Sequence, residues 1–101
     1  MPKGYVIVTE VIRDPEGMRA YAQAAAPTMA ASGATVLVVD SQPEVLEGEW
    51  PTTQTIVVEF PSVEAARAWY TSDAYAAAAK LRQAAADCNL VIAAGFEPPA
   101  R

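Results

Sequence analysis

Four stretches of the chain are apolar and rich in β-branched residues on both alternating faces, which is typical of strands covered on two sides. The predicted strands cover residues 4–12, 34–41, 54–60 and 89–96. A polar connection over residues 42–53 separates the second and third strands, and we expect Leu46 and Trp50 to anchor it. Residues from about 97 onward form a tail, because Pro98 and Pro99 cannot extend a strand ladder.

Between these stretches, apolar residues recur at spacings of three and four, which indicates amphipathic helices. The predicted helices cover residues 15–32, 63–71 and 73–86. Asp14 and Ser62 are placed to cap the first two helices, since their oxygens can accept hydrogen bonds from free backbone N–H groups. Gly33 can end the first helix in a left-handed conformation. Pro27 removes one backbone hydrogen bond from that helix and should bend or divide it.

Two helices carry apolar stripes that we expect to face the sheet. The stripe of the first helix consists of Met18, Tyr21, Ala22, Ala25 and Met29. The third helix is mostly alanine, and its expected inner face consists of Ala74, Ala77, Ala78, Leu81 and Ala85. Both stripes have the width of a face that packs on a core.

The order of elements is strand, helix, strand, strand, helix, strand, with the second helix interrupted at residues 71–73 to begin a third. This order predicts one α+β domain over residues 1–101, a ferredoxin-like β-α-β-β-α-β sandwich with a four-stranded antiparallel sheet. The helices cover one sheet face. The other face would be an exposed apolar patch, so we expect a second copy to cover it, sheet against sheet, in a homodimer. Alternatively, the tail and the 42–53 connection fold over it.

Composition and charge exclude several classes of function. The 101 residues carry a net charge of −5, and the seven Lys and Arg are scattered, so no basic face for nucleic acid or anionic membrane is expected. Histidine is absent, which rules out Ser-His-Asp triads and His-ligated zinc or haem. Cys88 is the single cysteine, and the glycines are too dispersed for a phosphate loop. We therefore expect no metal and no cofactor.

The chain shows no membrane or export signal in its sequence. No apolar run approaches the ~20 residues of a membrane span. Residues 1–12 lack the order of basic, apolar and small-residue regions that defines a signal peptide. We expect a cytoplasmic protein without a membrane partner.

Glu59 is the leading candidate for a catalytic residue. It alternates with Thr55 and Val57, whereas Phe60 belongs to a wholly apolar set, so Glu59 should lie on the sheet face opposite the helices. A carboxylate enclosed there by a second copy would have a raised pKa, which suits a general acid or base. The alternative is a strand-end glutamate that is hydrated or paired with Arg or Lys across the dimer. Glu10 also interrupts an apolar strand, but the pattern leaves its face undetermined.

Four further side chains are candidates for ligand binding. Arg82 shares a helical flank with Tyr75 and could bind a carboxylate or pair with Glu59 or Glu64; alternatively, it lies along apolar surface with its charge in water. The hydroxyls of Tyr70 and Tyr75 could orient a ligand, although aromatic residues at helical spacing often belong to a core. Trp50 could cover a pocket, or anchor the loop, or contact a partner copy.

Short motifs along the chain resemble, in order, those of the family called domain of unknown function 1330, in the dimeric α+β barrel superfamily. They are Lys3-Gly4-Tyr5, Asp14-Pro15-Glu16, Leu46-Glu47-Gly48-Glu49-Trp50, Glu59-Phe60-Pro61-Ser62, Ala68-Trp69-Tyr70, Ser72-x-x-Tyr75 and Leu81-Arg82. The resemblance covers about residues 3–96. It implies a ferredoxin-like fold whose sheets pair across a homodimer, with a cavity between sheet and helices or within the barrel.

The superfamily includes cofactor-free monooxygenases, haem-degrading enzymes, muconolactone isomerases and proteins without an assigned activity. Many relatives carry Gly-Gly where this chain has Gly33-Ala34, and an Arg-Gly-Gly-like segment near the place of Val39-Asp40-Ser41. An anionic ligand held by that arginine in relatives would need another partner here, and the lack of histidine disfavours haem degradation.

Together these observations predict a small homodimeric protein that binds a small molecule in a cavity near the sheet. A cofactor-independent enzyme is one form of this hypothesis, with Glu59 as acid or base and Arg82, Tyr70, Tyr75 and Trp50 around the ligand. The alternative is a non-catalytic dimeric interaction module whose motifs serve packing.

Overall fold

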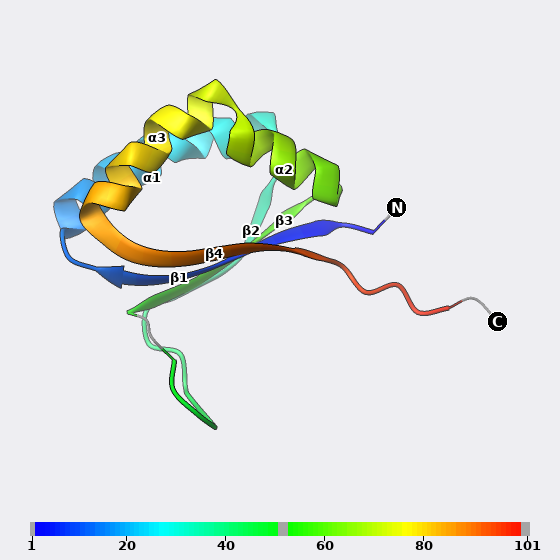
Figure 1. Ribbon diagram of the computed structural model, residues 1–101, viewed down its shortest axis with the longest axis horizontal. Helices are drawn as coiled ribbons and strands as arrows, with labels where there is room; N and C mark the ends of the chain where they lie inside the picture. Colours follow the sequence, from blue (N-terminus) through cyan, green and yellow to red (C-terminus); the bar gives the residue numbers. More distant parts are fainter. Residues whose placement is uncertain (1, 51–52, 100–101) are drawn as a thin grey trace.

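The computed structural model describes residues 2–50 and 53–99 of the chain. It contains one sheet with all of its helices on a single face (Figure 1). The elements are β1 (Gly4–Ile12), α1 (Pro15–Ala31), β2 (Thr35–Asp40), β3 (Gln54–Phe60), α2 (Val63–Thr71), α3 (Asp73–Ala85) and β4 (Ala86–Ala94). The predicted order of elements is confirmed. The last strand begins and ends earlier than expected, because Ala86 leaves α3 directly into extended backbone.

The four strands lie in the order β2-β3-β1-β4, and all neighbouring pairs are antiparallel. This is the ferredoxin-like arrangement predicted from the order of elements. β1 occupies the centre with β3 and β4 on its two sides, and β2 is a free edge that is exposed along its whole length. An irregularity between Val36 and Val38 shifts the register of β2 against β3.

Side-chain caps begin all three helices. Asp14 accepts a hydrogen bond from the Gly17 N–H, Ser62 from the Ala65 N–H, and Ser72 from the Tyr75 N–H. α1 runs without a break through Pro27, so the proline does not divide the helix, and the bend expected as the other outcome stays a prediction. Gly33 follows α1 with a φ of 73°, the left-handed conformation expected there.

An aromatic cluster fills the core where α2 and α3 meet the sheet. Trp69 is buried, with its ring 5.2 Å from that of Phe60 and 4.0 Å from that of Tyr75, measured between centroids. Its indole N–H donates to the Thr28 hydroxyl on α1 at 3.0 Å. The cluster therefore ties α1, α2, α3 and β3 together.

The inner face of α3 differs from the one predicted. Its buried residues are Tyr75, Ala78, Ala79, Arg82 and Ala85. Ala74 and Ala77 are exposed, and so is Leu81. Because alanine occurs all around this helix, the apolar pattern fixed its rotation poorly, and the aromatic contacts of Tyr75 decided it instead.

The connection between β2 and β3 projects away from the helices, and the C-terminal tail extends past the end of β4 (Figure 1). Leu46 is 83% exposed, so the prediction that it anchors the connection is wrong within a single chain. Neither segment folds back to cover the sheet, and the proposed alternative cover is therefore not seen in the described residues.

The open sheet face is less apolar than the sequence suggested. One row of aliphatic residues crosses all four strands. It consists of Val38, Val57, Ile7 and Val91. The neighbouring row on one side is polar, with the Asn89 amide donating to the Thr9 hydroxyl. On the other side the hydroxyl of Tyr5 donates to Glu59.

Candidate functional site

A cavity of about 460 Å³ lies between α1 and the helix-facing side of the sheet. Its walls are mainly aliphatic. They are formed by Val6, Val8, Ile56, Val58 and Leu90 of the sheet and by Met18, Ala22, Ala25, Ala26 and Met29 of α1. Val36 and Val39 of the edge strand also line it, and both are exposed. The cavity therefore opens between α1 and β2. Its size is within the range of small-molecule sites.

The predicted apolar stripe of α1 lines this cavity instead of closing onto the strands. Three of the α1 wall residues are alanines, whose side chains are too short to fill the space. α1 is also held by its contacts with the other helices. The hydroxyls of Tyr21 and Tyr75 lie 2.9 Å apart, and Trp69 donates to Thr28 on the same helix. These contacts support α1 above the sheet and leave the volume between them unfilled.

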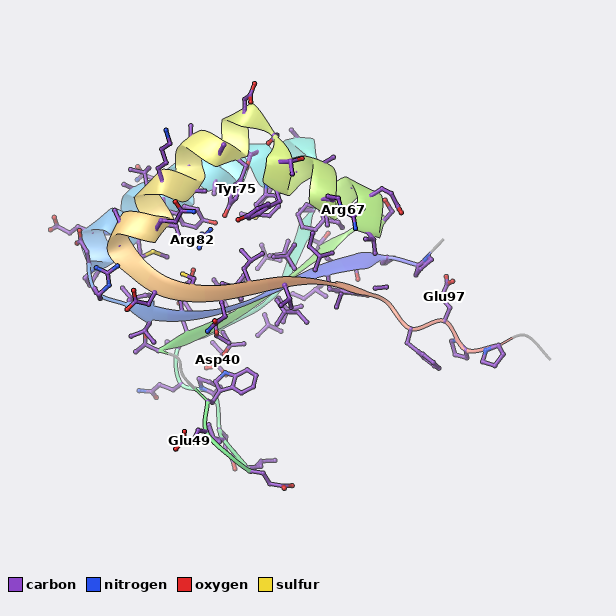
Figure 2. All side chains as sticks on the ribbon, in the orientation of Figure 1. Asp40, Glu49, Arg67, Tyr75, Arg82 and Glu97 are labelled. Atoms are coloured by element: carbon purple, nitrogen blue, oxygen red, sulfur yellow. The ribbon has the colours of Figure 1, made fainter. Side chains whose placement is uncertain are left out.

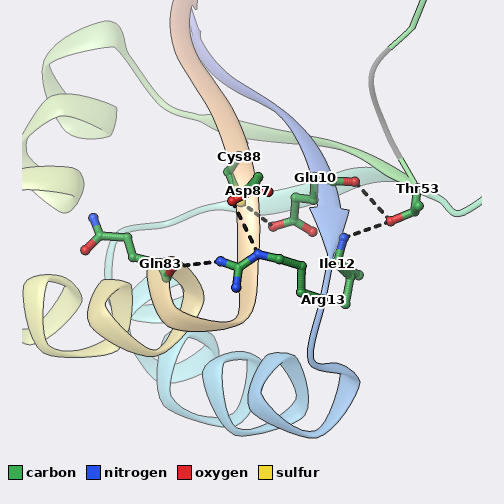
Figure 3. A network of polar contacts seen from close by, with 7 residues as sticks. All are labelled: Glu10, Ile12, Arg13, Thr53, Gln83, Asp87 and Cys88. Carbon is green, nitrogen blue, oxygen red and sulfur yellow. Dashed lines mark hydrogen bonds and ion pairs between the residues drawn. The ribbon is translucent and has the colours of Figure 1, made fainter.

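Glu10 provides a carboxylate at the buried end of the cavity. It follows Val6 and Val8 on the helix-facing side of β1, and only 1% of the residue is exposed. Its Oε1 accepts a hydrogen bond from the Gln54 amide at 2.9 Å. Its Oε2 lies 3.8 Å from the Cys88 Sγ on the neighbouring strand β4 (Figure 3). Glu10 and Gln54 face each other across the β1–β3 pair.

Arg82 provides a cation that lines the same cavity from α3. It is 5% exposed, so the expectation that its charge reaches water is wrong. Its Nε donates to the Tyr75 hydroxyl at 3.3 Å, and both side chains point into the space between helices and sheet (Figure 2). The guanidinium also interacts with the thiol of Cys88. Among the described residues, no ion pair joins Arg82 to Glu59 or Glu64.

Burial keeps the other polar groups of this end uncharged. Burial, followed by the hydrogen bond with Tyr75, raises the pKa of Tyr21 far above its usual value. Burial also raises the pKa of the Cys88 thiol. At neutral pH, Tyr21 is therefore a phenol and Cys88 a thiol. The buried end combines a carboxyl group, a guanidinium and neutral hydrogen-bonding groups in an aliphatic surrounding.

The structure brings together only part of the predicted ligand-binding set. Arg82 and Tyr75 are in direct contact, with Tyr75 fully buried behind Arg82. Tyr70 packs on Tyr75 but is 39% exposed and does not line the cavity. Trp50 lies on the projecting connection, half-exposed, where its indole N–H donates to the Thr55 hydroxyl. It is remote from the cavity beneath α1.

Glu59 lies on the open sheet face, as predicted from its alternation with Phe60. Its surroundings differ from those predicted. The Lys3 ammonium lies 3.1 Å from Oε1, and Tyr5 donates to Oε2 at 3.1 Å. In the single chain, the hydrogen bond from Lys3 lowers the pKa of Glu59, against a smaller opposing effect of desolvation. The raised pKa expected where a second copy encloses this face stays a prediction. A catalytic role for Glu59 stays a prediction that nothing in the single chain tests.

The pair of Lys3 and Glu59 predicts a pH-dependent contribution to stability. Because the folded-state pKa of Glu59 is below its ordinary value of 4.5, its stabilising effect is present above that value and is lost as the pH falls through the folded-state pKa. Glu59→Gln should therefore lower the melting temperature slightly at neutral pH and not at about pH 3. Thermal melts of both proteins across this range measure the difference. A gap that widens in acid would contradict the assignment.

Sequence reasoning missed Glu10, Gln54 and Tyr21 as site residues. Tyr21 belongs to the predicted apolar stripe of α1, and its ring packs edge-on against that of Tyr75. Glu10 interrupts the apolar pattern of β1, but both faces of this strand are apolar, so alternation does not assign the side on which Glu10 lies. Glu10 lies two residues after Val8 on the same strand, so the two side chains share one sheet face. This spacing places Glu10 toward the helices once Val8 is known to face them.

Metal and membrane features are limited in the described part of the chain. Across residues 2–50 and 53–99, no group of three or more Cys, Asp or Glu side chains is placed to hold a metal ion. Within the same ranges, every helix is too short or too polar to cross a bilayer.

The fold and the cavity define an α+β protein of the ferredoxin-like class with a pocket between helices and sheet. The chain belongs to the family described as domain of unknown function (DUF1330), whose model matches residues 3–96. Among proteins with curated descriptions, none matches the sequence.

Solved structures share this fold. A protein of unknown function from Rhodopseudomonas palustris is 23% identical, with a TM-score of 0.78 over 96% of this chain and 85% of that one. A conserved protein of unknown function from Bacteroides thetaiotaomicron, named as a candidate oxidoreductase, is 15% identical, with a TM-score of 0.54 over 92% and 97% of the two chains. A candidate antibiotic biosynthesis monooxygenase from Nitrosomonas europaea is 14% identical, with a TM-score of 0.54 over 99% and 97%. At these identities the likeness concerns the fold.

Proposed function

We propose that this protein binds a small molecule with an apolar body in the cavity between α1 and the sheet, and that it does so as a homodimer. The observation that carries the proposal is the pairing of about 460 Å³ of aliphatic-walled space with buried polar groups at one end. Binding sites typically have this composition, in which apolar walls provide affinity and a few polar groups fix orientation. A core built for stability alone would fill such a volume.

Cofactor-independent catalysis is consistent with the same groups. Glu10 is a carboxyl group able to accept a proton, and Arg82 and Tyr21 are donors able to stabilise an oxyanion. The candidate oxidoreductase and monooxygenase among the structural neighbours support a search for such activity here. The rival proposal is a non-catalytic dimeric module, in which the motif residues serve packing, as Trp69 and Phe60 do.

A neutral fluorescent probe, N-phenyl-1-naphthylamine, should bind the cavity with increased emission. Ala22 lies on the exposed side of α1 and lines the cavity, so Ala22→Phe should fill the opening and abolish the emission increase. Ala24 is exposed on the same helix outside the cavity, and Ala24→Phe should leave binding unchanged. Equal binding by all three proteins, or no binding to the native protein, would contradict the proposed site.

The open sheet face supports the dimer. The aliphatic row across the four strands has no cover within the described chain, and Val91 is 55% exposed. Leu46 on the projecting connection and Phe96 on the tail are also exposed. A second copy, sheet against sheet, would cover these groups together, which is a more economical solution than leaving them in water.

Light scattering at micromolar concentration should give twice the chain mass of 10.7 kDa. Val57→Lys places a charge in the middle of the aliphatic row and should shift the mass toward the monomer. Leu81→Lys, on the exposed side of α3, is the matched control and should remain dimeric. A monomeric native protein would refute the dimer and leave the cavity proposal to be judged on its own.

A further inference from the structure

The projecting connection between β2 and β3 carries a second pocket, the connection pocket, of about 390 Å³. Its apolar wall consists of Pro43, Val45, Leu46 and Trp50. The indole N–H of Trp50 donates to the Thr55 hydroxyl at 2.9 Å, which holds the ring in place. Thr55 shares the open sheet face with Val57, and the connection projects away from the helices (Figure 1). The connection pocket therefore lies on the side that the proposed second copy would cover.

Phe96 is an exposed aromatic side chain at the opposite end of the sheet. It is 84% exposed, and only Leu46 approaches this value in the described part of the chain. β3 begins opposite Glu10 near the end of β1, whereas β4 ends opposite Gly4 at the start of β1. The nine residues of β1, roughly 30 Å, therefore separate the connection from the tail within one chain.

The symmetry of a sheet-against-sheet dimer allows two arrangements of these segments. The twofold axis lies between the two sheets and parallel to them. When the strands of the two sheets are aligned, an axis along the strands brings the two connections together. An axis across the strands reverses the partner's strands and brings each connection to the tail of the other copy. The choice is therefore between connection against connection and connection against tail.

Charge disfavours connection against connection. The connection carries three exposed carboxylates, those of Glu44, Glu47 and Glu49. Among the described residues, no ion pair involves them. The described part of the tail end holds one cation, Lys3, with the carboxylates of Glu59 and Glu97 (Figure 2). Because like charges repel across an interface, the connection meets less repulsion from the tail end than from a second connection.

Resting on the proposed dimer, we infer that the strands of the two copies run in opposite directions and that Phe96 of the partner subunit occupies the connection pocket. There its ring packs against Trp50 and Leu46, which removes the two most exposed apolar side chains of the described chain from water together. An aromatic side chain in a pocket is a typical anchor of a protein interface. By symmetry the contact occurs twice, so each connection pocket is complete only in the dimer.

Cysteine cross-linking distinguishes the two arrangements. Glu47→Cys and Glu97→Cys lie beside the contact and leave Trp50 and Phe96 unchanged, in a Cys88→Ser background. The chain with both substitutions should form a covalent dimer with the short cross-linker bismaleimidoethane, whereas each single substitution should leave separate chains on a denaturing gel. Within one chain the two positions lie at opposite ends of the sheet, so the link must join two copies. Cross-linking through Glu47→Cys alone would show connection against connection and overturn the inference.

A second measurement keeps the native cysteine. Phe96→Ala should raise the dissociation constant of the dimer at least about tenfold, because it removes the anchor from both pockets. Leu81→Ala, on the exposed side of α3, is the control and should leave this constant unchanged. Sedimentation over a dilution series measures both variants.

The outcomes separate this inference from the proposed dimer. A native dimer whose double-cysteine variant forms no link, or whose dissociation constant is unchanged by Phe96→Ala, would overturn the inference and leave the dimer intact. A monomeric native protein would overturn the inference together with the proposed dimer.

Discussion

Replacing Trp69 with alanine is expected to lower the free energy of unfolding by about 3–5 kcal/mol, the range found for large aromatic residues in cores. The indole is buried between the rings of Phe60 and Tyr75, at centroid distances of 5.2 and 4.0 Å. Its N–H also donates to Thr28, so the substitution leaves a cavity and removes a link to α1. Chemical denaturation of both proteins measures the change.

Tyr70→Ala is the matched control for Trp69→Ala. Tyr70 is adjacent in α2 and packs on the same cluster, with its ring 6.4 Å from that of Trp69, but it is largely at the surface. Tyr70→Ala should lower the free energy of unfolding by clearly less than Trp69→Ala does, by about 1 kcal/mol, the ordinary cost of a single substitution. A loss below about 1 kcal/mol for Trp69→Ala would place the indole outside the core and contradict the structure.

Gly4→Ala is expected to destabilise the protein by about 1–3 kcal/mol or more, as overpacking does in a tight core. A Cβ at this position would lie 2.5 Å from the carbonyl oxygen of Ser62 and 2.8 Å from the Cα of Val63. Both are backbone atoms at the start of α2, so neither can move aside as a flexible side chain would. The first residues of β1 and the cap of α2 must separate.

Gly95→Ala provides the comparison for Gly4→Ala. A Cβ at Gly95 would lie 3.1 Å from a ring carbon of Tyr5 and 3.2 Å from the Lys3 carbonyl oxygen. These contacts are tight but can relax by a few tenths of an ångström. Melting temperatures should therefore fall much further for Gly4→Ala than for Gly95→Ala. The reverse order would show that β1 and α2 approach each other less closely than described.

Glu10 and Glu59 illustrate how burial separates two carboxyl groups in neighbouring strands. The side chain of Glu59 lies near the surface beside Lys3 and is 23% exposed. This is an ordinary setting for a carboxylate near the end of a strand. Glu10 is enclosed among aliphatic side chains with Gln54 and Cys88. A carboxyl group in such a position is costly unless its contacts compensate it. Functional tests should therefore begin with Glu10.

The sequence by itself determined the elements of this protein and their order. Asp14, Ser62 and Gly33 carry local signals for where helices begin and end, because capping and left-handed geometry depend on neighbouring residues only. The alternation of Glu59 with Phe60 assigned the faces of β3 correctly, since one set was wholly apolar. Local rules of this kind were sufficient for the ferredoxin-like fold.

Only the tertiary structure decided where the candidate site lies. Both faces of β1 are apolar, so alternation could not assign the sheet face on which Glu10 lies. Because alanine occurs all around α3, the apolar pattern could not show that Arg82 lies on its inner face. The contacts of Tyr75 with Trp69 and Tyr21 set the rotation of α3 and the height of α1 above the sheet. The cavity is the space left beneath the alanines of α1 at that height. Such a volume depends on distances between whole elements, which a pattern along one chain segment does not contain.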